Sequence, residues 1–549
     1  MRHSPAGLSR RSLFRYGAAG AVAAALPVGA PAAQAAPPEP PPSATPPTFD
    51  LEEATIDALQ EKMASGAETA RSLAEKYLAR IEALDRKGPA LRSVLEVNPD
   101  ALAIAESLDA ERREKGPRGP LHGVPILVKD NVGTADRMST AAGSLALAGV
   151  APREDSSVVR RLRAAGAVIL GKTNLSEWAN FRSTHSSSGW SGRGGQCRNP
   201  YALDRNPSGS SSGSGAATAA NLAAAAVGTE TDGSIVSPST SCGIVGVKPT
   251  LGLVSRAGIV PIAHSQDTAG PMARTVRDAA ILLAAMAGAD PADPGTRTAP
   301  FRAEALGALD PSAIRGARLG VVRKSIFGNN PATDRVAESA LSALADLGAV
   351  LVDPADIETA GDLGRTELDV LLYEFKADLN AYLASLGPAS PVRTLAELIA
   401  WNERHRAREM PYFGQEIFER AEAKGPLTEQ AYRDALAADL ANARTKGIDA
   451  ALAEHRLDAL VCPTGGPAWM TDLVDGDGNG WGSSTVPAVA GYPHVTVPMG
   501  FVFGLPVGLS FFAGAWSEPR LLSYAYAFEQ ATCHRRPPRY LATADLAAS

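Results

Sequence analysis

Residues 207–250 read PSGSSSGSGAATAANLAAAAVGTETDGSIVSPSTSCGIVGVKPT. Two loops rich in glycine and serine flank an alanine-rich segment, which we expect to be an apolar helix. Because glycine has no side chain to hold a ligand away from the backbone, such loops bring N–H groups and hydroxyls close to a bound molecule. A serine nucleophile needs a base and a cluster of backbone donors, and this stretch supplies most of that apparatus.

The second loop, residues 228–235, leaves an apolar segment and turns at Gly233. A turn there directs successive N–H groups into one space, which suits the oxyanion of an acyl-transfer reaction. Ser234 stands at the end of this turn. A serine hydroxyl is a weak nucleophile until a base takes its proton, and no histidine lies nearby in the sequence.

Lys129 is the alternative base. It follows Val124–Val128, a short apolar run that predicts a buried strand. Burial lowers the pKa of a lysine and leaves a neutral amine that accepts a proton. The serines at 210–212 offer a relay towards Ser234, and serine–lysine versions of the triad are chemically sound. Taken singly, a lysine at a strand end is more often a surface residue, and a Ser/Gly loop more often caps a helix.

Two other motifs compete for the first loop. Residues 209–213 match G-x-S-x-G, the nucleophile elbow of α/β-hydrolases, with Ser211 as the nucleophile. That elbow follows a hydrophobic strand, whereas residues 204–208 are polar and interrupted by Pro207. A phosphate-binding loop also leads into a helix, but the Gly-Lys-Ser/Thr ending is missing here. Both alternatives are therefore disfavoured.

Helix and strand patterns alternate along the chain, which predicts an α/β fold. Residues 51–113 and 366–455 show helical periodicity, and we expect the second of these to form a cap on the sheet. Further helices are predicted at 156–165 and 334–347, and strands at 124–128, 167–170, 318–322, 349–352, 457–461, 495–497 and 507–511.

Composition and the N-terminus predict an exported globular protein. The 549 residues carry a formal net charge of -6. After the first sixteen residues the chain has no basic tract, which argues against nucleic-acid binding. Residues 1–36 combine a twin-arginine motif, Arg10–Arg11, with an apolar run and a cleavage-like site, as in a bacterial export signal. We expect an extracellular or cell-envelope protein with no stable membrane span after processing, and a proline-rich linker at 37–50.

Cysteine and histidine give no sign of a metal or cofactor site. The eight histidines are scattered and form no H-E-x-x-H motif. Four cysteines are too few for a disulfide scaffold. Buried free thiols are favoured, while one or two disulfides stay open among Cys197, Cys242, Cys462 and Cys533.

These motifs resemble the amidase signature family. The likeness runs from about residue 51 to 535, and we take 51–540 as the amidase domain. It is carried by residues 209–214, 228–235, 242–250, 121–131 and 267–274. The resemblance implies a large mixed β-sheet covered by helices on both faces, and neither a cofactor nor a metal.

The resemblance also implies a catalytic triad. Ser234 matches the nucleophile, Lys129 the base, and Ser210 a bridging serine whose preceding peptide bond is cis. The N–H groups of Thr231, Asp232, Gly233 and Ser234 match the oxyanion hole. Ser234 then attacks an amide, ammonia or an amine leaves, and water releases the acid from the acyl-enzyme.

Within this family the chain resembles the bacterial peptide amidases, which act on C-terminal peptide amides. Two residues after the nucleophile this chain has Val236, whereas many members of the family carry arginine at that position. The likeness is carried by residues 174–181, 189–191, 371–376 and 490–493. We expect a peptide or small-molecule amide substrate and a monomer or homodimer, with aryl and aliphatic amides still open.

Two other functions share this scaffold. A component of a tRNA-linked amidotransferase has the same fold and triad, but export argues against it because charged tRNA is cytoplasmic. A binding protein without catalysis would not need Ser234, Ser210 and Lys129 together. Amide hydrolysis is therefore the expected function.

Overall fold

A computed structural model describes residues 48–297, 299–478 and 480–548. The predicted export signal at 1–36, and the predicted linker as far as residue 47, lie outside these residues. Within the described part, no helix combines the length and the apolar character that a bilayer span requires. All four cysteines are free thiols, of which Cys533 is exposed and the others are buried.

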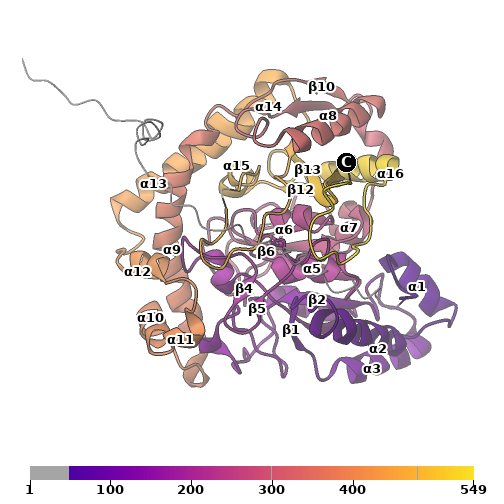
Figure 1. The fold of residues 1–549 in the computed structure, drawn as a ribbon, viewed down its shortest axis with the longest axis vertical. Helices are drawn as coiled ribbons and strands as arrows, with labels where there is room; N and C mark the ends of the chain where they lie inside the picture. Colours follow the sequence, from indigo (N-terminus) through magenta and orange to yellow (C-terminus); the bar gives the residue numbers. More distant parts are fainter. Residues whose placement is uncertain (1–47, 298, 479, 549) are drawn as a thin grey trace, which may run out of the picture. The chain divides into compact units, whose positions relative to one another are not determined.

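One mixed sheet of eleven strands organises the fold (Figure 1). Its strands are β1 Val94–Val97, β2 Pro125–Lys129, β3 Val168–Thr173, β6 Ala225–Glu230, β7 Val245–Lys248, β8 Thr268–Ala273, β9 Arg318–Val321, β10 Val350–Val352, β11 Ala459–Pro463, β12 His494–Val502 and β13 Leu505–Phe512. They lie in the order β1-β3-β2-β6-β8-β7-β12-β13-β11-β9-β10. β2 runs parallel to β3 and β6, and β9 runs parallel to β10 and β11, whereas the other neighbours are antiparallel.

Helices cover both faces of this sheet. On one face a large apolar core joins the strands to α1 Ile56–Ala64, α2 Ala70–Arg80, α3 Ala101–Lys115, α4 Ser157–Ala164, α7 Val276–Met286, α8 Pro331–Asp346 and α16 Glu518–Thr532. The other face carries α5 Ser212–Ala219 and α6 Val236–Ser241.

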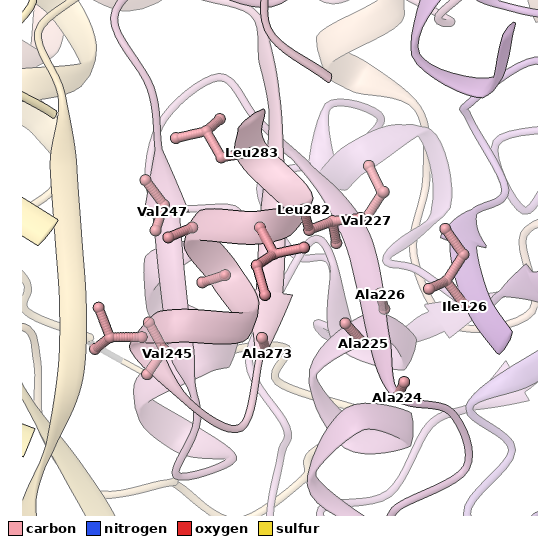
Figure 2. Packing of buried hydrophobic residues seen from close by; sticks show 14 of the residues in the cluster. Ile126, Ala224, Ala225, Ala226, Val227, Val245, Val247, Ala273, Leu282 and Leu283 are labelled. Carbon is pink, nitrogen blue, oxygen red and sulfur yellow. The ribbon is translucent and has the colours of Figure 1, made fainter. Parts of the chain in front are cut away.

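Strand β7 shows the two faces directly. Val245 and Val247 lie in the same large core as Leu282 and Leu283 of α7 (Figure 2). Gly246 lies between the two valines and faces α6, where a Cβ would come within 2.3 Å of Ser239 Oγ. Because side chains alternate between the faces of a strand, α6 and α7 lie on opposite sides of the sheet. The expected mixed sheet with helices on both faces is confirmed.

The alanine-rich segment corrects one expectation. We predicted a single apolar helix between the two loops, but the helix α5 ends at Ala219 and residues 225–230 form β6. Asn221 turns the chain with a positive φ of 59°. Alanine favours a helix only weakly against tertiary pairing, and here β2 and β8 hydrogen-bond β6 on both sides. Helix propensity is therefore overridden at the centre of the sheet.

Residues 366–455 are mostly helical, as predicted. They form α9 Gly364–Ser385, α10 Leu395–Arg404, α11 Arg406–Glu409, α12 Glu416–Glu422, α13 Gln430–Leu440 and α14 Asp449–His455 (Figure 1). Phe375 of α9 and Phe418 of α12 stack at 5.2 Å between ring centroids. The apolar side chains of α9, α10 and α12 pack with loop residues of 141–150, 178–181 and 260–263, so these helices cap the loops that follow the strands.

The parallel neighbours β2 and β6 position the site. Val128 pairs with Val227, so Lys129 at the end of β2 lies beside the start of the second loop. The carboxyl ends of adjacent parallel strands meet at one edge of a sheet, where α/β proteins bind ligands. The fold therefore brings together a lysine and a serine-bearing loop about a hundred residues apart in sequence.

Candidate active site

Lys129 is fully buried and surrounded by hydroxyl groups. Its Nζ lies 2.7 Å from Ser210 Oγ and 3.0 Å from Ser211 Oγ. It also donates to Thr229, 2.9 Å from Oγ1 and 3.3 Å from the carbonyl oxygen. Burial lowers the pKa of Lys129 to about 7, against the opposing pull of the negative charges of Asp267 and Glu230. A neutral amine is therefore accessible near neutral pH.

The first loop presents Ser210 to this amine. Ser210 is buried, and the Gly209–Ser210 peptide bond is cis, as the resemblance implies. Glycine is required at 209 because a Cβ there would lie 2.2 Å from Ser176 Oγ. The sequence-predicted relay and base are thus in direct contact.

Ser211 has a bridging role that the sequence did not assign. Its Oγ accepts from Lys129, donates to the carbonyl oxygen of Thr229 at 3.0 Å and accepts from the N–H of Thr229 at 3.1 Å. Its own N–H donates to the carbonyl oxygen of Ser234 at 3.1 Å. Ser211 therefore holds the first loop against β6 and the second loop. No strand precedes it within residues 203–210, so the nucleophile elbow is not formed.

The second loop turns as the sequence predicts. Gly233 has a φ of +77°, and a Cβ there would lie 2.9 Å from both Ser237 Oγ and Ser484 Oγ. The carboxylate of Glu230 accepts from the N–H groups of Ile235 and Val236, at 2.7 and 3.0 Å. These bonds fix the chain on both sides of the turn.

Four successive N–H groups of this loop are left without a protein acceptor. They belong to Thr231, Asp232, Gly233 and Ser234, and none of them donates a hydrogen bond within the described residues. A peptide N–H is an obligatory donor when buried, so these groups are available to a ligand oxygen. Ser234 is 8% exposed, and the contact between the loops runs through its carbonyl oxygen and the N–H of Ser211.

Asn131 and Thr229 complete the surroundings of the lysine. Asn131 Nδ2 donates to Thr229 Oγ1 at 2.9 Å, so this hydroxyl accepts from two groups. Asn131 stands only two residues after Lys129. This short distance from the predicted base is the sequence signal that could have marked Asn131 as a site residue. Thr229 lies within β6, and its role depends on a strand that the sequence did not predict.

Two cavities flank the site. One, of about 480 Å³, is lined by Asn131, Thr229 and Thr231 together with Asp267, Arg256 and His264. The other, of about 490 Å³, is lined by Ser208 of the first loop, Ser237 after the second loop, and by Ser484, Thr485, Trp469 and Trp481. Both volumes suit a small molecule or a short peptide end.

One group of residues has the spacing of metal ligands. Potential ligand atoms of His264, Glu374 and Asp378 lie within 4.8 Å of one another. His264 Nδ1 is already 2.9 Å from Asp378 Oδ2, and Glu374 accepts from Tyr432 and from the N–H of Ser265. The hydrogen bond with Asp378 and the charge of Glu374 raise the pKa of His264. Ion pairing accounts for this arrangement.

The amidase family profile matches residues 72–522. The chain belongs to the amidase family. An Arabidopsis thaliana relative named a probable amidase is 43% identical over 506 residues, which cover 90% of this chain and 93% of the relative. The amidase assignment agrees with the geometry, and the chain is an amide-hydrolysing enzyme.

The solved amidase structures include a close match. The native peptide amidase of Stenotrophomonas maltophilia is 52% identical, with a TM-score of 0.86, and the match covers 90% of this chain and all of that one. A relative from Chloroflexus aurantiacus, a component of its glutamyl-tRNA(Gln) amidotransferase, is 37% identical over 89% of this amidase and 99% of the relative.

Proposed function

We propose that Ser234 is the nucleophile, Ser210 the proton relay and Lys129 the base of a hydrolase that acts through an acyl-enzyme. The observation that carries this proposal is the contact of 2.7 Å between Lys129 Nζ and Ser210 Oγ at a fully buried lysine. The loop that ends in Ser234 adds four free N–H donors to the same site.

The proposed reaction balances without a cofactor. Ser234 Oγ attacks the amide carbon, its proton passes to Ser210, and Ser210 gives its own proton to neutral Lys129. The C–N bond then breaks, and the protons return along the same path to the leaving nitrogen, which departs as ammonia or an amine. Water repeats the attack on the Ser234 ester and releases the acid.

The four free N–H groups supply the oxyanion site of this proposal. Negative charge develops on the carbonyl oxygen when Ser234 attacks, and backbone donors that are already in place stabilise it without reorganisation. One such donor is worth about 10²- to 10³-fold in kcat. The N–H groups of residues 235 and 236 donate to the carboxylate of Glu230, and these bonds keep the loop in that geometry.

The substrate we propose is the C-terminal amide of a peptide. Support comes from the 52% identity to a peptide amidase over nearly the whole of both chains. A cavity of about 490 Å³ beside the second loop, with serine, threonine and tryptophan in its walls, has room for the end of a peptide. The amidotransferase alternative rests on relatives of 37% identity, and it predicts that the purified chain alone does not hydrolyse a simple amide.

The decisive experiment replaces the nucleophile. We expect Ser234→Ala to reduce the hydrolysis of a peptide amide by more than about 10⁴-fold, with an unchanged thermal unfolding temperature. Ser239→Ala, in α6 a few residues later, is the matched control, since Ser239 Oγ is buried without a partner among the described residues. Peptide amide, anilide and glutamine are compared by the release of ammonia or aniline. Activity of Ser234→Ala near that of the control would refute the mechanism.

A further inference from the structure

A pair of acids, half-buried Asp232 and buried Glu367, lies behind the second loop. Asp232, within the loop, accepts from Thr485 Oγ1 at 2.7 Å through Oδ2, while its buried Oδ1 has no conventional donor among the described residues. Glu367 of α9 is 8% exposed, and its carboxyl group lies near that of Asp232, so that each acid shifts the pKa of the other. A helix outside the sheet thus contacts the loop that carries the proposed oxyanion donors.

Gln266 makes a second connection between the same two elements. Its Nε2 donates to Glu367 Oε1 at 3.0 Å and to the carbonyl oxygen of Thr231 at 3.2 Å. Gln266 is buried, with 2% of its surface exposed. Glu367 therefore reaches the second loop twice, once through Asp232 and once through Gln266 and Thr231.

The contact between the two acids requires a proton. Two carboxylates are both acceptors and repel each other, so one must be protonated to donate. Burial, followed by the charge of Asp232, raises the pKa of Glu367 well above its ordinary value. Burial also raises the pKa of Asp232, but bonds from Ser484 and Thr485 and the charge of Lys248 oppose this rise and favour its ionised form. The proton thus belongs on Glu367, which then acts as a hydrogen-bond donor.

We propose that Glu367, as a neutral acid, is a positioning residue for the second loop and holds its free N–H groups in place through Asp232 and Gln266. The inference rests on the proposed function of that loop. Glu367 touches no reacting atom and acts only on the donors. Its loss is therefore expected to slow the chemical step, where charge develops on the carbonyl oxygen, more than it weakens substrate binding.

Charged groups around Glu367 make its positioning role depend on pH. Asp439 faces Glu367 from α13, and its negative charge opposes ionisation of Glu367. Glu230 and Asp232 also carry acid groups at the loop, and Lys248 of β7 is the cation that acts on both. When the pH rises and Glu367 ionises, a second negative charge meets Asp232 and the bond between them is lost. We expect an alkaline limb in the kcat profile as a result.

The test compares Glu367→Gln with Glu367→Leu. Glutamine keeps an acceptor for Gln266 and a permanent donor for Asp232, so kcat stays within about twofold of wild type and the alkaline limb disappears. Leucine keeps the volume but removes both bonds, and we expect kcat to fall on the order of 10- to 100-fold while KM changes by less than about threefold. The assay is release of ammonia from a peptide amide between pH 5 and 10.

A matched pair of control variants tests whether any partly buried glutamate would do the same. Glu529 of α16 accepts from the N–H of Val276 at 2.8 Å, on the opposite face of the sheet from the loop. Glu529→Leu and Glu529→Gln are expected to leave kcat and the pH profile unchanged, whatever they do to thermal stability.

The outcomes separate this inference from the proposed function. Full activity of Glu367→Leu, or an alkaline limb that persists in Glu367→Gln, overturns the positioning role even when Ser234→Ala is inactive. An active Ser234→Ala instead removes the proposed function itself. If Glu367→Leu fails to fold, the pH profile of Glu367→Gln decides alone.

Discussion

Two lysines on neighbouring strands are equally buried but face different surroundings. The register of β2 and β3 pairs Lys129 with Thr173 and Val128 with Lys172. Because neighbours along a strand point to opposite faces, Lys129 and Lys172 extend to opposite sides of the sheet. Burial lowers the pKa of Lys129 to about 7 and that of Lys172 to about 8.

The partners of the two lysines differ in chemistry. Lys129 contacts the hydroxyls of Ser210, Ser211 and Thr229, and the first two belong to the loop that touches Ser234. Lys172 donates to the carbonyl oxygen of Val132 and to Thr140 Oγ1, near the negative charge of Asp130. A depressed pKa is therefore shared by a structural lysine and a proposed catalytic one. What distinguishes them is a hydroxyl that can pass a proton on.

The largest expected difference comes from removing each amine. Methionine keeps the length and much of the volume of lysine. We expect Lys129→Met to lower kcat/KM for a peptide amide by about 10³-fold, since it removes the general base. Lys172→Met is expected to stay within about threefold in kcat/KM but to lower the free energy of unfolding by about 2 kcal/mol, because the carbonyl oxygen of Val132 and the hydroxyl of Thr140 lose a buried donor.

Urea denaturation and initial rates measured on the same preparations separate the two effects. If Lys172→Met loses as much activity as Lys129→Met, the proposed difference between the two lysines is refuted, because burial alone would then govern function. The same difference is refuted if Lys129→Met retains wild-type rates.

The pH dependence of the rate sharpens the same comparison. Lys129 accepts a proton only when neutral, and it is protonated below its pKa of about 7. We expect kcat/KM to fall about tenfold per pH unit below that value and to level off above it, until the alkaline limb expected from Glu367 begins. Lys172→Met should keep this limb, whereas the residual activity of Lys129→Met should lack it. A wild-type profile that stays flat down to pH 5 would contradict the role of Lys129.

Apolar runs in the sequence predict most of the strands on either side of the sheet's centre. All seven strands predicted from such runs are present, from β2 to β13, with ends displaced by up to about five residues. The central strands β6, β7 and β8 and the edge strand β1 were not predicted. Glycine and alanine make up half of β6 and of β8, β7 has only four residues, and β1 lies within the region 51–113 that was predicted to be helical. Gly228 shows the reason, since a Cβ there would lie 2.9 Å from Ser211 Oγ. Close packing of α5 against the sheet excludes the side chains that make a strand recognisable.

The residues of the candidate site also divide into those that the sequence predicts and those that it does not. Lys129, Ser210 and the second loop are recognisable from long motifs, and the structure brings Lys129 and Ser210 into contact. Thr229 and Glu367 are not recognisable, because their importance comes from strand pairing and from a helix more than a hundred residues away. Local sequence therefore predicts the groups that carry chemistry better than the groups that hold them in place.

The smallest expected effect concerns one hydroxyl beside each lysine. Thr229 Oγ1 accepts from Lys129 at 2.9 Å, and Thr140 Oγ1 accepts from Lys172 at 2.9 Å. An acceptor stabilises the charged amine, so its loss lowers the lysine pKa further. We expect Thr229→Val to move the acid limb of kcat/KM to lower pH by about half a unit to one unit, with a loss of about fivefold at the plateau. Thr140→Val should leave the limb in place, because Lys172 takes no part in proton transfer. Equal shifts in both variants would show that the limb reports the electrostatics of the whole sheet and not Lys129.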